Sequence, residues 1–299
     1  GLLLYSVQST VTLFTSTQPG RTAYFRAEEE GLGKSVMIIE AIKRRFIIQL
    51  PFDYKKAVLT QARTSPHRPY AFIVEFNDGI RKFMKGPFKS ADLAQDHVIC
   101  NEIKRRLASK YLHPIQCEIK GYGAGLFFLE CEEIGRADLS RVTIKRTKLE
   151  VRPFEVLEYG SNDVVPDPLA FLSRIDDKNR DIWIEVMVNY CFRWVFGIGD
   201  TARRNLMLQR STGRIYSTDE TGVETVSHEN VWGGKKSDRK TFELVRDCVE
   251  SDHFNEVLIE VKSWKESLGL IRREVVPLSL EVDGRINKLL NDPKIVFDI

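Results

Sequence analysis

The stretch that decides the fold is YCFRWVFGIGDTARRNLMLQRSTGRIYSTDETG, residues 190–222. A helical apolar run ends at Gly-Ile-Gly-Asp, and Asn205 follows Asp200 by five residues. A strand-like Leu-Met-Leu run, a Ser-Thr-Gly turn and a second short strand then lead to Asp219. A hairpin over these two strands would place Asn205 and Asp219 side by side.

Three polar side chains in this stretch are of the types that phosphoryl transfer from ATP requires. One carboxylate must meet the acceptor hydroxyl, while an amide and a second carboxylate hold Mg²⁺ against the phosphates. We therefore take Asp200 as the candidate catalytic residue and Asn205 and Asp219 as candidate metal ligands. Because Asp and Asn also favour turns, a plain helix and hairpin with acidic turns would contain the same residues.

The order and spacing of these residues resemble the catalytic core of the phosphatidylinositol 3-/4-kinase-like superfamily, which includes related atypical protein kinases. That family reads G-I-G-D-R-H-x-x-N-I-M, followed by a Gly turn and a hydrophobic strand that ends in D-F-G. This chain has Thr201-Ala202 in place of Arg-His, and Glu220-Thr221-Gly222 where Phe-Gly follows the aspartate. The matching positions are Gly199-Asp200, Asn205, Met207, Gly213 and Asp219.

Residues 57–110 are similar to the upper lobe of the same superfamily. Two strand-like runs, Tyr70–Phe76 and Ile80–Met84, flank Asn77-Asp78-Gly79, which is a strong hairpin signal. A helix-like segment with Ala94-Gln95-Asp96 follows. The resemblance implies a phosphate-covering loop at Thr64 and Ser65, a phosphate-binding Lys85 at the end of the strand, and Asp96 as the acid that fixes this lysine. Lys82 and Lys89 are rival lysines, and Glu102 is a rival acid.

The family order also predicts an adenine-binding hinge after the buried-strand run Leu126–Glu130. Backbone groups of Glu132 and Ile134 would bond the adenine edge. A hinge binds adenine through main-chain atoms, which the sequence does not reveal. The same residues could therefore form a core strand with an exposed acidic end. Ala202 stands where the family has a proton-transferring His, so Arg203 or Arg204 is the candidate that stabilises the transferring phosphoryl group, unless both are solvated.

The predicted fold is α+β, a bilobal protein-kinase-like fold with a β-rich upper lobe and a mainly helical lower lobe. We expect an N-terminal extension over 1–56, the upper lobe over 57–134 and the lower lobe over 135–299. Within the extension, a strand-like start precedes a helix-like Val36–Phe46. In the lower lobe, apolar residues at helical spacing predict a central core helix over Ile182–Val195 and further helices over 241–299.

Composition narrows the class of protein. The net charge of +3 over 299 residues is too small to imply nucleic acid as a partner. The five cysteines are odd in number and lack metal-ligand spacing, which predicts reduced thiols in a cytoplasmic or nuclear compartment. No apolar run of about eighteen residues is present in the sequence, so no transmembrane segment is expected.

We therefore predict an enzyme that binds ATP and Mg²⁺ and transfers the γ-phosphate to a hydroxyl of a phosphoinositide or of a protein Ser/Thr. The basic residues Lys235, Lys236, Arg239 and Lys240 are typical of a lipid-binding activation loop, and equally of a solvated turn. A peripheral contact with a membrane is left open. The alternative is a catalytically weak or dead pseudokinase that acts as a nucleotide-binding scaffold, since Ala202 cannot transfer a proton.

Overall fold

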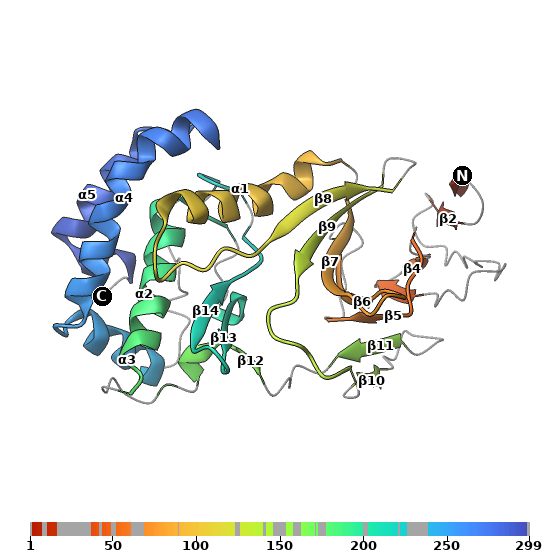
Figure 1. The fold of residues 1–299 in the computed structure, drawn as a ribbon, viewed down its shortest axis with the longest axis horizontal. Coiled ribbons are helices and arrows are strands. Elements are labelled where there is room, and N and C mark those ends of the chain that lie inside the picture. Colours follow the sequence, from red (N-terminus) through yellow and green to blue (C-terminus); the bar gives the residue numbers. More distant parts are fainter. Residues whose placement is uncertain are drawn as a thin grey trace. The chain divides into compact units, whose positions relative to one another are not determined.

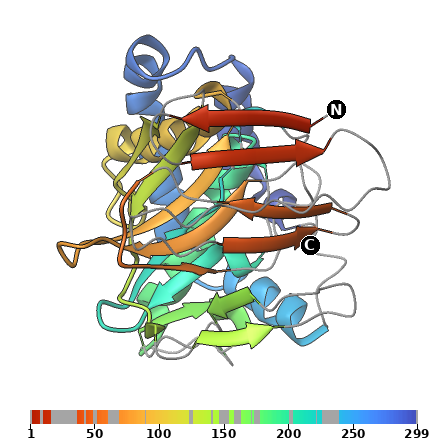
Figure 2. The same cartoon turned by 90° about the vertical axis from the view of Figure 1, so that its right-hand side faces the viewer.

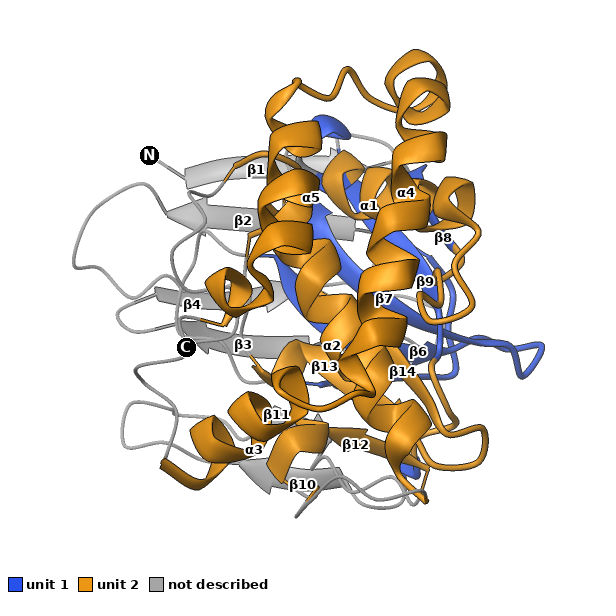
Figure 3. Ribbon diagram, turned by 90° about the vertical axis from the view of Figure 1, so that its left-hand side faces the viewer, with its two compact units in different colours: residues 1–94, 117–133, 138–160 blue, residues 95–116, 134–137, 161–299 orange. Residues whose placement is uncertain are grey.

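A computed structural model of the chain shows an α+β fold (Figure 1). Contacts among its residues define two compact units (Figure 3). Unit 1 holds residues 1–94, 117–133 and 138–160, and unit 2 holds residues 95–116, 134–137 and 161–299. The structure describes residues 2–7, 11–16, 37–41, 44–48, 52–60, 69–88, 90–122, 126–139, 142–145, 154–157, 163–170, 172, 178–199, 203–220, 222–225 and 239–297.

The main sheet of unit 1 consists, in chain order, of strands β5 (Lys56–Leu59), β6 (Tyr70–Glu75), β7 (Arg81–Phe88), β8 (Cys117–Gly121), β9 (Phe127–Glu132), β10 (Val142–Lys145) and β11 (Phe154–Leu157). Their spatial order is β10-β11-β5-β6-β7-β9-β8 (Figure 1). Neighbours from β5 to β8 are antiparallel, and β11 joins β5 by a parallel pairing of Val156 with Leu59. The sequence thus forms a mainly antiparallel sheet.

The predicted hairpin between β6 and β7 is confirmed. Tyr70 pairs with Gly86 and Glu75 with Arg81. At the turn, the Ile80 backbone N–H donates to Asp78 Oδ1 at 2.9 Å, and Gly79 has φ +83°, a left-handed conformation that favours glycine. Turn chemistry therefore fixes the register in which Lys85 lies opposite Ala71.

Both faces of the central strands are buried. On one face, Tyr70, Phe72 and Val74 pack with other apolar side chains of unit 1, among them Met84 and Phe128. The intervening residues Ala71 and Ile73 point to the opposite face and are also buried. The near-continuous apolar run of β6 is what a strand covered on both sides requires.

The N-terminal segment contains two antiparallel strand pairs. Strands β1 (Leu2–Val7) and β2 (Val11–Ser16) pair with each other, as do β3 (Met37–Ala41) and β4 (Arg44–Ile48) (Figure 2). The strand-like start is confirmed, but the predicted helix over Val36–Phe46 is wrong. The isoleucines of Met37–Ala41 and the Phe-Ile-Ile end of β4 favour the pleated conformation, because branched and aromatic side chains pack well on a sheet.

Unit 2 contains helices α1 (Asp92–Leu107), of which residues 95–107 belong to this unit, α2 (Arg180–Val195), α3 (Arg239–Val249), α4 (Phe254–Glu274) and α5 (Glu281–Asn291). Helix α2 packs against α4 and α5 (Figure 1). The predicted core helix and the predicted C-terminal helices are confirmed. The expected stripe of α2 is buried: Trp183, Met187, Tyr190, Cys191 and Trp194.

The unit boundary near helix α1 differs from the predicted domain boundary, which placed all of residues 57–134 in one lobe. The buried residues Cys100, Ile103 and Leu107 of α1 join the hydrophobic core of unit 2. Residues 95–116 therefore belong to unit 2 rather than to the sheet unit. The apolar spacing of these residues along the helix is the physical reason, because that stripe must be covered.

A three-stranded sheet lies in unit 2, with β13 (Leu206–Gln209) between β12 (Val164–Pro166) and β14 (Arg214–Ser217). Strands β13 and β14 form the hairpin predicted from residues 206–219, with Leu206 opposite Ser217 and Gln209 opposite Arg214. None of the described helices combines the length and the apolar character that a membrane span requires.

Two glycines give opposite predictions for substitution by alanine. At Gly79 an added Cβ meets no atom within 4 Å, so Gly79→Ala should cost about 1 kcal/mol from the left-handed backbone alone. At Gly269, inside α4, an added Cβ also meets nothing, and Gly269→Ala should stabilise by roughly 0.5–1 kcal/mol. Urea unfolding measures the change in the free energy of unfolding for both variants. Changes of the same sign would contradict the backbone conformations assigned to these two glycines.

Candidate functional site

Two predicted metal ligands lie at the open end of the β13–β14 hairpin. The Thr218 backbone N–H donates to the Asn205 carbonyl at 2.8 Å, and the Thr218 hydroxyl donates to the same oxygen at 3.1 Å. Asn205, which ends the short 3₁₀ helix η3 (Arg203–Asn205), is thus opposite the residue that precedes Asp219. Asn205 is buried and Asp219 half-buried. The backbones of the two residues are therefore neighbours, and their joint binding of a metal ion stays a prediction.

Asp219 has an uncommon backbone conformation. Its φ is +53°, in the left-handed region that L-residues other than Asn, Asp and Gly rarely adopt. Such a conformation costs free energy and persists only where surrounding contacts hold it, which is common at functional sites. Strand β14 ends at Ser217, and the left-handed conformation turns the chain at the candidate ligand Asp219.

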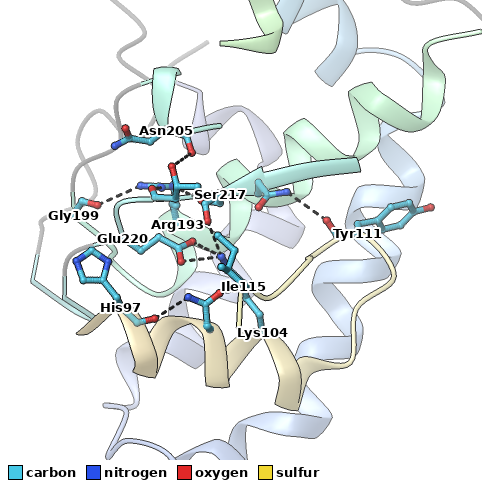
Figure 4. Close-up of polar contacts among 12 residues, drawn as sticks. His97, Lys104, Tyr111, Ile115, Arg193, Gly199, Asn205, Ser217 and Glu220 are labelled. Carbon is cyan, nitrogen blue, oxygen red and sulfur yellow. Dashed lines mark hydrogen bonds and ion pairs between the residues drawn. The ribbon is translucent and has the colours of Figure 1, made fainter. Parts of the chain in front are cut away.

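A buried guanidinium connects the two loops that carry the candidate residues. Arg193 of α2 is 1% exposed. Its Nη1 donates to the Gly199 carbonyl at 3.3 Å, its Nε to the Ser217 hydroxyl at 2.9 Å, and its Nη2 to the Thr218 carbonyl at 2.6 Å (Figure 4). One side chain therefore holds the residue before Asp200 and the residue before Asp219. The fixed fork of an arginine suits this role.

A buried ion pair holds the residue that follows Asp219. Lys104 Nζ of α1 lies 2.7 Å from Glu220 Oε1 and 2.8 Å from Oε2, and it donates to the Ser217 carbonyl at 3.1 Å (Figure 4). The two side chains are 0% and 2% exposed. Glu220 stands where the resembling family has an apolar Phe, and Lys104 supplies the charge that makes a buried carboxylate tolerable there.

The charges around this pair affect neighbouring titratable groups. Burial raises the pKa of the Cys100 thiol well above its ordinary value, and the Glu220 carboxylate adds to the rise, while Lys104 and Arg193 oppose it. Burial also raises the pKa of Asp96, two turns earlier in α1 than Ile103. Asp96, the predicted partner of Lys85, belongs to unit 2 and is half-buried.

Lys85 lies inside β7 rather than at its end, because the strand continues to Phe88 after a register shift. The predicted strand end is wrong in this detail. Lys85 is buried, at 5% exposure, and sits between Ala71 on β6 and Leu129 on β9. A lysine in such apolar surroundings needs a compensating interaction. Its rival Lys82 is half-buried and pairs in register with Glu132, and Lys89 lies outside the described residues.

The structure describes the surroundings of the rival acid Glu102 and of the strand before the predicted hinge. Glu102 forms ion pairs with Arg105 and Arg106 on its own helix. The strand predicted over Leu126–Glu130 is present as β9 (Phe127–Glu132), with Phe128, Leu129 and Glu130 buried. Their roles as lysine partner and adenine hinge stay predictions.

The chain passes from unit 1 to unit 2 between Glu133 and Ile134. Glu132 is exposed and Ile134 half-buried, while Arg81 holds Glu133 at 2.6 Å. Glu132 and Ile134 therefore flank Glu133, which Arg81 holds in place. This is the point at which the chain leaves unit 1. An adenine contact by the main-chain atoms of Glu132 and Ile134 stays a prediction.

Arg203 forms an ion pair with Asp167 at 3.4 Å, and both side chains are partly exposed. Arg204 is exposed. A phosphate-binding role for Arg203 would therefore require it to share its guanidinium with Asp167. The remaining predicted residues, Thr64, Ser65 and Asp200, lie outside the described residues, as do Thr201 and Ala202.

The donor set at the hairpin fits Mg²⁺ rather than a softer metal. An amide oxygen and a carboxylate are hard oxygen ligands, and Mg²⁺ takes one or two protein carboxylates together with substrate phosphates and water. Within the part of the chain that the structure describes, no three His, Cys, Asp or Glu side chains form a ready-made metal cage. Asn205 and Asp219 would hold the ion, with phosphates completing its shell.

Sequence reasoning missed three residues that organise this region: Arg193, Lys104 and Glu220. Lys104 stands in a run of three basic residues that is typical of an exposed helix end. A signal was present, because Lys104 follows Cys100 by four residues and precedes Leu107 by three, which places it on the apolar stripe. An acidic residue replacing an apolar one in a family motif was the corresponding signal for Glu220.

No protein-family model matches the chain, and no curated protein matches it significantly. The resemblance to the phosphatidylinositol 3-/4-kinase-like superfamily therefore rests on the motif residues alone.

Proposed function

We propose that this chain is a Mg-ATP-dependent phosphotransferase, a divergent kinase of the phosphatidylinositol 3-/4-kinase-like type. The observation that carries the proposal is the β13–β14 hairpin. It sets Asn205 opposite Thr218, directly before Asp219 in its left-handed conformation. An amide and a carboxylate carried by these neighbouring backbone positions would supply the pair of oxygen donors that a nucleotide-bound Mg²⁺ uses.

The order of elements in unit 1 also supports the proposal. The segment with Thr64 and Ser65 connects the paired strands β5 and β6, Lys85 is buried in β7, and α1 follows. In the proposed kinase fold, unit 1 corresponds to the β-rich upper lobe and unit 2 to the helical lower lobe. The assignment of residues 95–116 to unit 2 is a departure from the simplest form of that fold.

Each residue then has a defined task. Lys85 would bind phosphate oxygens, with Asp96 as its acid, and Thr64 and Ser65 would offer hydroxyl and N–H groups. Backbone groups of Glu132 and Ile134 would contact adenine. Bound Mg²⁺ would neutralise charge on the phosphates.

Three further residues concern the transfer itself. Asp200 would orient the acceptor hydroxyl and accept its proton. Arg203 would offset negative charge on the transferring phosphoryl group. Arg193 would hold the loops of Asp200 and Asp219 in their relative positions through Gly199 and Thr218.

The proposed acceptor is a hydroxyl of a phosphoinositide or of a protein Ser/Thr. Arg239 and Lys240, at the start of α3, are exposed, and they would be available to phosphate groups of a lipid headgroup. Lys235 and Lys236 lie outside the described residues. The alternative, a pseudokinase scaffold, is favoured by Ala202, because proton transfer typically contributes about 10²–10⁴-fold to the rate.

The proposal is tested by transfer of γ-³²P from ATP with purified protein. Phosphoinositide vesicles, a generic Ser/Thr protein substrate and water are offered as separate acceptors, each with Mg²⁺ or with EDTA. We expect Mg²⁺-dependent label on lipid or protein. Nucleotide binding without transfer to any acceptor would favour the pseudokinase scaffold, and neither binding nor transfer would reject both functions.

A further inference from the structure

Two cysteines of unit 1 lie directly opposite each other on neighbouring strands. Cys117 of β8 pairs in register with Cys131 of β9. Directly opposite residues of an antiparallel pair point to the same face, with Cα atoms about 4.5 or 5.5 Å apart. Both spacings lie within the roughly 4.4–6.8 Å that a disulfide spans.

The two thiols already contact each other. A hydrogen bond links Cys131 to Cys117, and it is the main cause that raises the pKa of Cys131 well above its ordinary value, with burial second. The nearby Lys85 ammonium opposes this rise, because a positive charge favours the thiolate. The raised pKa disfavours the Cys131 thiolate, so Cys117 is the better candidate for the first attack on an oxidant.

The other cysteines of the chain are in a different state. Cys100, Cys191 and Cys248 are buried, whereas Cys117 and Cys131 are half-buried. Burial raises the pKa of all three buried thiols, that of Cys248 to about 12. Because an oxidant must reach the sulfur atom, we expect these three buried thiols to react much more slowly than the half-buried pair.

We propose that Cys117 and Cys131 form a reversible intramolecular disulfide when the protein meets a peroxide. The Cys117 thiolate attacks one oxygen of H₂O₂, the O–O bond breaks, and Cys117 sulfenic acid and one water result after protonation. Cys131 then attacks the Cys117 sulfur, the S–O bond breaks, and a second water leaves with the Cys131 proton. Two thiols are oxidised by two electrons, and one H₂O₂ is reduced to two waters.

This disulfide would join β8 and β9 directly before the exposed residue Glu132. It would also change the surroundings of Lys85, because Phe83, the residue opposite Cys131, and Lys85 point to the same face of β7. The site is a chemical property of unit 1, and it does not depend on the proposed phosphotransfer.

The test treats the folded, reduced full chain with stoichiometric H₂O₂. Alkylation of the remaining thiols under denaturing conditions, non-reducing digestion and mass spectrometry follow. We expect two of the five thiols to disappear, a cross-linked peptide pair containing Cys117 and Cys131, and complete recovery with dithiothreitol. Cys117→Ser and Cys131→Ser should each abolish the cross-link, while Cys100, Cys191 and Cys248 stay alkylated in every sample.

Three results would overturn the inference. The first is an unchanged count of thiols after peroxide treatment. The second is a cross-link that involves a buried cysteine. The third is an intermolecular disulfide seen as a dimer on a non-reducing gel. Each of these results would be seen with the wild-type protein alone. The test therefore does not depend on whether the serine variants fold.

Discussion

Replacing Asp219 by alanine is expected to lower Mg²⁺-dependent phosphotransfer by about 10³-fold, the size typical of losing one charge-stabilising group at a phosphoryl centre. The carboxylate would be one of only two protein ligands proposed for the ion, and a water cannot replace its charge. Folding should be little affected beyond the turn itself, because the side chain is half-buried at the end of a strand.

The backbone of Asp219 requires a second variant. Alanine is disfavoured at φ +53°, so Asp219→Ala also perturbs the turn, whereas Asp219→Asn keeps the left-handed preference and removes only the charge. Asp247→Ala, on an exposed face of α3, is the matched control and should retain full turnover. Steady-state ATP turnover at several Mg²⁺ concentrations measures the effect. Full activity of Asp219→Asn would remove this residue from the proposed site.

Replacing Lys104 by methionine should destabilise the protein by about 3–5 kcal/mol, because it leaves the Glu220 carboxylate buried without its partner. The Ser217 carbonyl also loses the hydrogen bond that it accepts from the Lys104 ammonium. Methionine keeps most of the volume, so the loss reports the charge rather than a cavity. Urea unfolding followed by circular dichroism measures the change in free energy.

Two further variants separate the ion pair from packing. The double variant Lys104→Met/Glu220→Leu should recover most of the lost stability, since replacing a buried pair by apolar side chains is often neutral or stabilising. Lys294→Met, which breaks the exposed ion pair with Glu250, should leave stability nearly unchanged. If Lys104→Met were as stable as Lys294→Met, the buried ion pair would be contradicted. If the double variant recovered no stability, the loss in Lys104→Met would be due to packing and not to the unpaired charge.

Local patterns in the sequence predicted most of the elements that carry the candidate site. The Asn77-Asp78-Gly79 turn, the core stripe of α2 and the β13–β14 hairpin follow from periodicity and turn residues, which are local properties. The helix predicted over Val36–Phe46 failed because a short apolar run fits either periodicity, and pairing between β3 and β4 decides the outcome.

The long-range polar network could not be predicted from the sequence. Arg193 stands in an apolar helix and would be expected at a surface, yet it bonds Gly199 and Thr218 inside the protein. Lys104 and Glu220 are 116 residues apart, so their pairing depends on tertiary packing that no local pattern encodes. The assignment of α1 to unit 2 depends on that same packing.

The most direct test of the account is the stabilisation of the folded protein by Mg-ATP. With nucleotide at 100 times its Kd, the free energy of unfolding should rise by about 2.7 kcal/mol. The rise should fall sharply in Asp219→Asn, persist in Asp247→Ala, and disappear when EDTA removes the metal. An unfolding curve that saturating Mg-ATP does not move, or an equal shift in Asp219→Asn, would contradict the proposed nucleotide site.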